Sequence, residues 1–265
     1  MNSSGHKAII VAAGRGRRLG QSTDEIPKCM VKVGGRPILH WQLEALSAAG
    51  VRDVVVVRGY RGNCIDPGPF PVRFIENPAW AENNILASLM YAAHELDSGF
   101  FFSYCDIVYS KSAASRLATT VDQPVAGSLI VDRRWADAYA GRTLHPVSEA
   151  ELTRVDPAAN AVLQVGKGAV PPSSAVGEFI GLAYFSAEGG KAIAATWQEA
   201  LHAGGLGAPF GRAQTLRQAY LTDALNVMVA AGKHLAPVYI NGEWREIDTR
   251  QDLAAAEKAM TLWAR

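Results

Sequence analysis

A segment rich in glycine and arginine is the first candidate for chemistry in the sequence. It reads Gly14-Arg15-Gly16-Arg17-Arg18 and directly follows the apolar run at residues 8–13. Glycine lets backbone N–H groups approach an anion closely, and arginine neutralises its charge, so this Gly-Arg loop favours binding of a triphosphate. The alternative is an arginine-bearing surface turn. The glycine spacing departs from the dinucleotide pattern G-x-G-x-x-G, and the Walker pattern is absent.

Two aspartates far apart in the sequence are candidates for binding a cation. Asp106 follows the apolar segment at residues 100–104, and Asp248 follows the segment at residues 244–247. Mg²⁺ binds hard oxygen ligands and usually keeps water and substrate phosphates as further ligands. Each aspartate taken singly has another explanation, because Asp106 suits a turn after a strand and Asp248 or Thr249 suits a helix cap.

The order of apolar segments indicates the framework that must position these residues. Continuous apolar runs predict buried strands at residues 7–12, 53–57, 72–75, 100–104, 125–131, 177–186 and 235–240. Helical spacing predicts helices at residues 38–49, 83–96, 111–120, 187–203, 213–231 and 251–263. This order predicts an α/β fold with a Rossmann-like, doubly wound, mainly parallel sheet, which binds ligands beyond the carboxyl ends of its strands. The prolines and weaker pattern at residues 133–175 predict a small β-rich lid, inserted in a single domain of residues 1–265.

Composition argues against several classes of protein. The chain has 265 residues, a formal net charge of +1 and 49% apolar residues, as expected for a globular protein with a buried core. The near-zero net charge argues against nucleic-acid binding, and no apolar stretch reaches the length of a membrane span. Three cysteines without a C-x-x-C pair favour a reducing, cytoplasmic setting.

The segment from Ala8 to Leu39 resembles the signature of the nucleotidyltransferases that activate sugar phosphates and related phospho-compounds. Their pattern is roughly L-A-A-G-x-G-x-R-L, then P-K, then V-x-G-K-P-L, and Pro27-Lys28 and Val33–Pro37 occupy the corresponding places here. The sequence departs from the pattern at Gly20 and Asp24-Glu25, where many members have Pro-Leu-Thr, and at Arg36, where lysine is usual. Neither change removes a phosphate-binding charge. The resemblance extends over residues 7–256 and implies the fold of the nucleotide-diphospho-sugar transferases.

This resemblance also implies roles for individual residues. Arg18 and Lys28 match the positions that contact phosphates, and Asp106 and Asp248 match the pair that binds Mg²⁺. The nucleotide-binding loop of the family corresponds to Ala12, Ala13, Gly14 and Gly16.

Shorter segments resemble the cytidylyltransferases that act on phosphocholine, aminoethylphosphonate or inositol phosphate. Asn83, Asn84 and Ser88 match N-N-x-x-x-S-L, and amides could read the edge of a pyrimidine because they both donate and accept hydrogen bonds. A helix cap by one of the asparagines is the alternative, and both roles are compatible. Lys167 and Glu178 lie in segments similar to V-x-x-I-G-K and G-E-F-I-G, where Lys167 would reach the substrate or the α-phosphate.

The segments at residues 135–146 and 220–225 resemble acceptor-binding parts of the same branch. We therefore expect Trp135, Glu178, Tyr220 and Asp223 at the acceptor. Asp223 would meet a cationic group, and Tyr220 or Trp135 would offer it an aromatic face. Helix packing is the alternative for Tyr220. Glu246 is expected to face solvent or a neighbouring arginine, and His145 to be an ordinary loop residue.

The function implied by the resemblance is a Mg²⁺-dependent transfer of CMP from CTP to a phosphonate or phosphate-monoester acceptor, with release of pyrophosphate. The expected partners are CTP and a small acceptor, without nucleic acid or membrane, and a homodimer is compatible. Two alternatives stay open: a sugar-1-phosphate nucleotidylyltransferase using UTP, dTTP or GTP, and a catalytically inactive nucleotide-binding regulator. The glycine spacing argues against a nicotinamide dehydrogenase.

Overall fold

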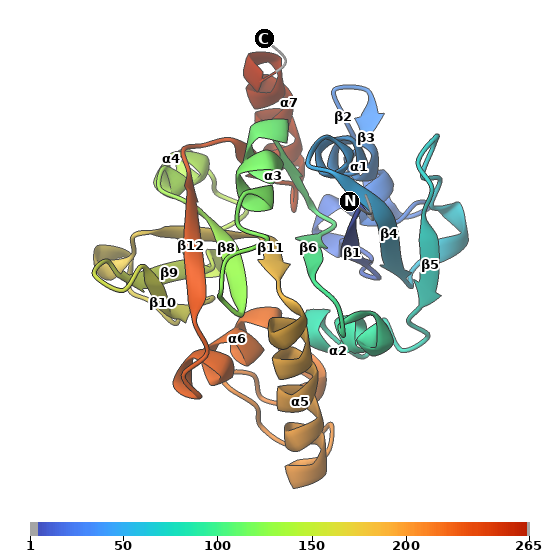
Figure 1. The fold of residues 1–265 in the computed structure, drawn as a ribbon. Helices are drawn as coiled ribbons and strands as arrows, with labels where there is room; N and C mark the ends of the chain where they lie inside the picture. The colour runs from blue at the N-terminus through green and yellow to red at the C-terminus, as the bar shows by residue number, and fades with distance from the viewer. Residues whose placement is uncertain (1–4, 264–265) are drawn as a thin grey trace.

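The computed structural model describes residues 5–263, and a mixed sheet forms its centre (Figure 1). In this part of the chain the main sheet has the strand order β10-β9-β11-β6-β1-β4-β5, with β8 between β11 and β12. Four neighbouring strands run parallel: β1 (His6–Ala12), β4 (Val51–Arg58), β5 (Arg73–Glu76) and β6 (Phe100–Tyr104). The predicted α/β fold with a mainly parallel sheet is confirmed.

One strand, β11 (Gly177–Phe185), runs antiparallel to three neighbours. These neighbours are β6, β8 (Gly127–Asp132) and β9 (Leu152–Asp156). The remaining strands of the sheet are β10 (Ala161–Val165), which forms a hairpin with β9, and β12 (Leu235–Ile240), which is parallel to β8. Two small ribbons pair β2 (Lys32–Val33) with β3 (Arg36–Pro37), and β7 (Ile107–Tyr109) with β13 (Trp244–Glu246).

Helices cover both faces of the sheet (Figure 1). Alternate residues of a strand point to opposite faces, so Ile9 and Val11 join the layer with α2, α5 and α6, whereas Ala8 and Ile10 join the layer with α1 and α3. Within residues 5–263, none of the helices is long and apolar enough to cross a membrane. The α-helices are α1 (Ile38–Ala48), α2 (Ile85–Met90), α3 (Lys111–Ala118), α4 (Trp135–Tyr139), α5 (Ala187–Gly204), α6 (Leu221–Ala230) and α7 (Arg250–Trp263).

Two helices are shorter than the spacing of apolar residues predicts. Helix α2 begins at Ile85, because the side-chain oxygen of Asn84 accepts a hydrogen bond from the Ile85 N–H and caps the helix. Helix α6 begins at Leu221 rather than at residue 213. Residues 213–220 form a loop with one 3-10 turn at Leu216–Gln218, in which the N–H groups of residues 216 and 217 bond to the carbonyls of residues 208 and 206.

The segment predicted as an inserted lid contains α4 and the β9–β10 hairpin, and its first loop is attached to α7. Arg142 Nε donates to Asp252 Oδ1 at 2.7 Å, and only 8% and 1% of these side chains are exposed. The side chain of Gln251 accepts from the Thr143 N–H at 2.9 Å and donates to the Gly141 carbonyl at 2.8 Å. These contacts hold residues 141–145 against the start of the last helix.

A bulge in β11 brings the backbone of the sheet against the ring of Tyr104, at the end of β6. The register of β11 with β8 shifts between Phe179 and Ala183, and Gly181 there has φ +83°. Glycine adopts this conformation without a steric penalty. A Cβ atom at Gly181 would overlap the ring of Tyr104.

We expect Gly181→Ala to destabilise the protein by about 2–5 kcal/mol, from backbone strain and from displacement of the Tyr104 ring. In thermal unfolding, Tm should fall by roughly 2–4 °C for each kcal/mol lost. Gly207→Ala is the matched control, since no heavy atom lies within 4 Å of a Cβ at Gly207. Equal Tm values for the two variants would contradict this account of the bulge.

Candidate active site

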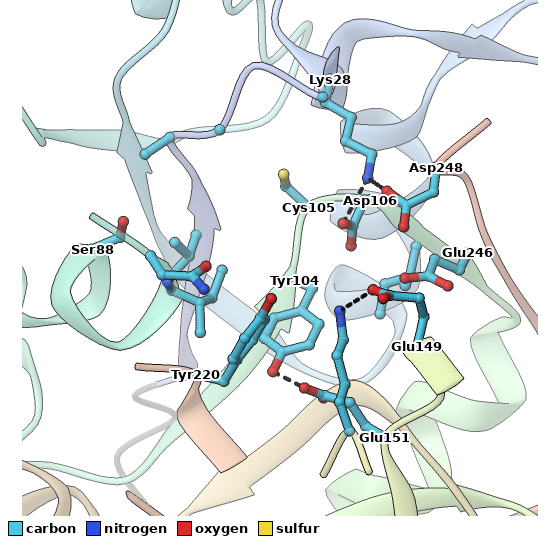
Figure 2. A pocket seen from close by; sticks show the side chains of 18 of the residues that line it. Lys28, Ser88, Tyr104, Cys105, Asp106, Glu149, Glu151, Tyr220, Glu246 and Asp248 are labelled. Carbon is cyan, nitrogen blue, oxygen red and sulfur yellow. Dashed lines mark hydrogen bonds and ion pairs between the residues drawn. The ribbon is translucent and has the colours of Figure 1, made fainter. Parts of the chain in front are cut away.

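A cavity of about 360 Å³ lies beyond the carboxyl ends of β1 and β6 (Figure 2). Its walls come from segments that are far apart in the sequence, and they include most of the residues singled out above. The predicted residues that line it are Ala13, Gly14, Gly16, Arg18, Lys28, Asn83, Asn84, Ser88, Asp106, Lys167, Glu178, Tyr220 and Asp248. Ala12 is buried at the end of β1, immediately before this loop.

Lys28 lies between the two predicted metal-binding aspartates (Figure 2). Its Nζ donates to Asp106 Oδ2 at 2.8 Å and also to Asp248 Oδ1. Pairing of β7 with β13 places the two aspartates side by side, and the Ile247 N–H bonds to the Asp106 carbonyl at 2.8 Å. Thr249 caps α7 through its hydroxyl, which accepts from the Asp252 N–H at 3.2 Å. Asp248 is therefore not needed as the cap and faces the cavity.

The Gly-Arg loop adds positive charge to the same place. Arg18 donates to Asp248 Oδ2 and lies 3.8 Å from a carboxylate oxygen of Glu149. Gly16 has φ +71°, and a Cβ there would approach the Lys28 side chain to 3.0 Å. Glycine at this position thus lets the loop backbone pack directly on the lysine.

The charges of this cluster stabilise one another. Burial by itself lowers the pKa of Lys28, but Asp106, Asp248 and Glu246 raise it above its ordinary value. Burial likewise raises the pKa of Asp248, but the charges of Lys28, Arg18 and His145 hold it below its ordinary value. Lys28 is therefore an ammonium group at neutral pH. It can stabilise negative charge but cannot accept a proton.

His145 corrects the expectation of an ordinary loop residue. It is fully buried, because the contacts of residues 141–143 with α7 hold its loop inside the molecule. Its Nδ1 lies 2.9 Å from Arg142 Nη2 and 3.4 Å from Asp248 Oδ2, and its Nε2 lies 3.5 Å from Glu246. Glu246 lines the cavity, with 19% of its side chain exposed. Ligand atoms of His145, Glu246 and Asp248 lie within 4.8 Å of one another, which makes them a further set of donors for a cation.

The predicted nucleotide-binding amides have partners within the protein. Asn84 caps α2 and donates to the Gln218 carbonyl at 3.1 Å. Asn83 belongs to a side-chain network with Asn77 and Ser88, in which Asn77 Nδ2 donates to Ser88 Oγ at 2.9 Å and to Asn83 Oδ1 at 3.0 Å. The cap predicted as an alternative role is therefore present at Asn84, and the network fixes the orientation of Asn83.

Sequence reasoning missed Glu149 and Glu151, which lie on the opposite side of the cavity from Ser88 (Figure 2). Lys167 Nζ lies 3.2 Å from Glu149 and 4.8 Å from the centre of the Tyr220 ring. Glu151 is buried, and it accepts hydrogen bonds from the hydroxyls of Tyr104 at 3.1 Å and Thr222 at 3.4 Å. Glu149 ends a 3-10 turn at Val147–Glu149 and Glu151 lies just before β9, so no regular spacing in the sequence indicated that both would line the cavity.

Glu178 is buried with an unpaired oxygen. Its Oε1 accepts from the Tyr139 hydroxyl at 2.8 Å, while Oε2 has no hydrogen-bond partner within residues 5–263. Burial raises the pKa of Glu178 to about 8 and that of Glu151 to about 7. The charge of Lys167 lowers the pKa of Glu151 and that of Arg142 lowers the pKa of Glu178, but neither charge offsets the effect of burial.

Two predicted acceptor residues do not line this cavity. Asp223 accepts from the backbone N–H groups of Tyr220 and Arg212, both at 2.9 Å, and it lines a neighbouring cavity. Both of its oxygens are thus used in fixing the start of α6. Trp135 packs edge-on against Tyr139, with ring centres 5.8 Å apart, beside Ala150 and Leu152.

Comparisons with known proteins identify the family and agree with the fold. The model of the MobA-like NTP transferase domain matches residues 8–167. A CTP:phosphoglutamine cytidylyltransferase from Campylobacter jejuni is 26% identical over 93% of this chain and 97% of its own length. A 2-aminoethylphosphonate cytidylyltransferase from Lancefieldella rimae is 29% identical over 73% of this chain and 72% of its own length.

A solved structure gives the same picture at the level of the fold. The CTP:phosphocholine cytidylyltransferase from Streptococcus pneumoniae superposes with a TM-score of 0.73 at 20% identity, over 97% of this chain and 99% of that chain. The family model matches more than half of the sequence, which shows membership of the family and not only a shared fold. This chain belongs to the MobA-like NTP transferase family and is a nucleotidyltransferase.

Proposed function

We propose that the protein is a Mg²⁺-dependent cytidylyltransferase that transfers CMP from CTP to a phosphonate or phosphate-monoester acceptor and releases pyrophosphate. The main support is the cluster in which Lys28 joins Asp106 and Asp248 next to the Gly-Arg loop. The relative that matches nearly the whole chain is named as a CTP-using enzyme with a phosphorylated acceptor. Asn83 and Ser88, fixed by their shared network, are proposed to face the cytosine edge.

The side chains of the cavity suit a reaction limited by charge repulsion. In the proposed reaction an acceptor oxygen attacks the α-phosphorus, and pyrophosphate leaves on the opposite side. A phosphate or phosphonate oxygen is already ionised at neutral pH, so no general base is required. Arg18 and Lys28 would hold the triphosphate and stabilise the leaving pyrophosphate, and Lys167 would offset charge at the α-phosphate or the acceptor. Catalysis then consists mainly of positioning and electrostatic stabilisation.

The chemistry of the donors fits Mg²⁺. Asp106 Oδ1 is a buried carboxylate oxygen without a hydrogen-bond partner among the described residues, and Mg²⁺ prefers hard oxygen ligands. Asp106 and Asp248 are therefore the residues proposed to hold the ion. When bound, Mg²⁺ would supply positive charge that offsets the repulsion between the phosphates of the two substrates.

Asp106→Asn should reduce kcat by about 10²–10³-fold, which corresponds to the loss of one transition-state contact. The substitution keeps the shape of the side chain, so circular dichroism and Tm should indicate a retained fold. Asp97→Asn, at an exposed carboxylate before β6, is the control and should keep normal turnover. Near-normal turnover of Asp106→Asn at saturating Mg²⁺ would remove Asp106 from the proposed site.

Lys28→Met should lower both stability and activity, since it leaves two carboxylates without their shared cation. Removing one partner of a buried ion pair lowers the free energy of unfolding by about 3–5 kcal/mol. Adding Asp248→Asn should recover part of that loss in thermal unfolding, because one uncompensated charge is removed, but it should not recover turnover. Recovery of turnover in the double variant would limit Lys28 to a structural role.

Release of pyrophosphate should be fastest with CTP when CTP, UTP, dTTP and GTP are compared with a panel of phosphonates, phosphate monoesters and sugar 1-phosphates. EDTA should abolish the reaction, and added Mg²⁺ should restore it. A preference for another triphosphate with a sugar 1-phosphate would replace the proposal with a sugar nucleotidylyltransferase. Binding of CTP without turnover on any acceptor would indicate a regulator.

A further inference from the structure

Cationic side chains of the protein occupy most of the carboxylate oxygens of Asp106 and Asp248 (Figure 2). Lys28 Nζ donates to one oxygen of each aspartate, and Arg18 Nη2 donates to the second oxygen of Asp248. Among residues 5–263, the remaining oxygen, Asp106 Oδ1, has no hydrogen-bond partner. Three of the four oxygens proposed to hold a metal ion therefore already have a cationic partner.

The charges of these four side chains are balanced, because two carboxylates face one ammonium and one guanidinium group. Lys28 and Asp248 are both buried, with 7% and 5% of their side chains exposed. A divalent cation added beside the Lys28 ammonium would place excess positive charge in this recess, where like charges repel more strongly than they do in water. Lys28 and a metal ion thus compete for the same oxygens.

Both cations have another place to go within the cavity. Lysine carries its charge on a long flexible stem, and Lys28 lines the cavity together with Gly14 and Gly16 of the Gly-Arg loop. Arg18 lines the same cavity, and 45% of its side chain is exposed. A triphosphate at the loop offers both side chains phosphate oxygens as partners. Their departure would leave the two aspartates in need of a new cation.

We propose that Lys28 and Arg18 close the metal site until a nucleoside triphosphate draws them away from the aspartates, so that nucleotide binding creates the site for the divalent cation. This inference rests on the proposed function, because it concerns the nucleotide and the metal of the same reaction. The nucleotide-free protein then has little affinity for the metal. Nucleotide and metal strengthen each other's binding, and this coupling is reciprocal.

The first test measures binding of Mn²⁺ without nucleotide, by electron paramagnetic resonance of the free ion. Mn²⁺ takes the same oxygen ligands as Mg²⁺. Lys28→Met should bind Mn²⁺ about 10-fold or more tightly than the wild type does, since it frees two carboxylates and removes a repelling charge. Adding Asp106→Asn should abolish this gain. Lys233→Met is the matched control, because it frees the carboxylate of Glu188 on the surface, and it should bind Mn²⁺ as the wild type does.

The second test uses the wild type and does not depend on the folding of Lys28→Met. In protein labelled with ¹⁵N-lysine, the NMR signal of the buried Lys28 ammonium is identified by its shift in Asp106→Asn. CTP in the presence of EDTA should shift this signal in the wild type, because Lys28 moves to the triphosphate. Mg²⁺ alone, at a concentration that supports turnover, should leave the signal unchanged.

Three results would overturn the inference. One is equally tight binding of Mn²⁺ to the nucleotide-free wild type and to Lys28→Met, as expected if His145 and Glu246 hold the ion without release of Lys28. The others are a shift of the Lys28 signal with Mg²⁺ alone and the lack of a shift with CTP in EDTA. If CMP transfer accompanies any of them, the proposed function stands and only this inference fails. Absence of transfer to any acceptor refutes the proposed function itself.

Discussion

The ammonium group of Lys28, held between two carboxylates, is the interaction on which the site depends. Its partners Asp106 and Asp248 lie 78 and 220 residues away in the sequence. Without the lysine, two negative charges would face each other at the edge of a largely apolar sheet. The arrangement also keeps positive charge permanently available, because the carboxylates stabilise the protonated amine. The same cluster therefore contributes to folding and to the binding of phosphates.

The helices and strands around this cluster position its side chains but do not use them as helix caps. Thr249 caps the last helix, which leaves Asp248 directed at Lys28. Next to Asp248, the attachment of Arg142 to Asp252 holds His145 inside the molecule. The inserted segment is thus part of the wall of the site. Its position depends on its contacts with α7 as much as on its own hairpin.

Local patterns in the sequence predicted much of this structure. The alternation of buried strands and helices led to the fold, and the contiguous motif from Ala8 to Leu39 led to the Gly-Arg loop and Lys28. The start of α6 could not be predicted, because residues 213–220 have helical spacing but bond to carbonyls of a neighbouring loop. Asp223 and Trp135 were assigned to the acceptor from short segments alone, and neither of them lines the main cavity. His145, Glu149 and Glu151 depend on how the insertion folds back, which local spacing does not encode.

The pairing of β7 with β13 has a consequence for biosynthesis. The segment that supplies Asp248 leaves the ribosome well after Lys28 and Asp106 have emerged. Domains fold as their chains are synthesised, so the nascent protein holds an incomplete cluster until the antiparallel ribbon closes. A shortened product that ends before β13 would retain the nucleotide-facing loop but would lack one of the two acids that neutralise its lysine.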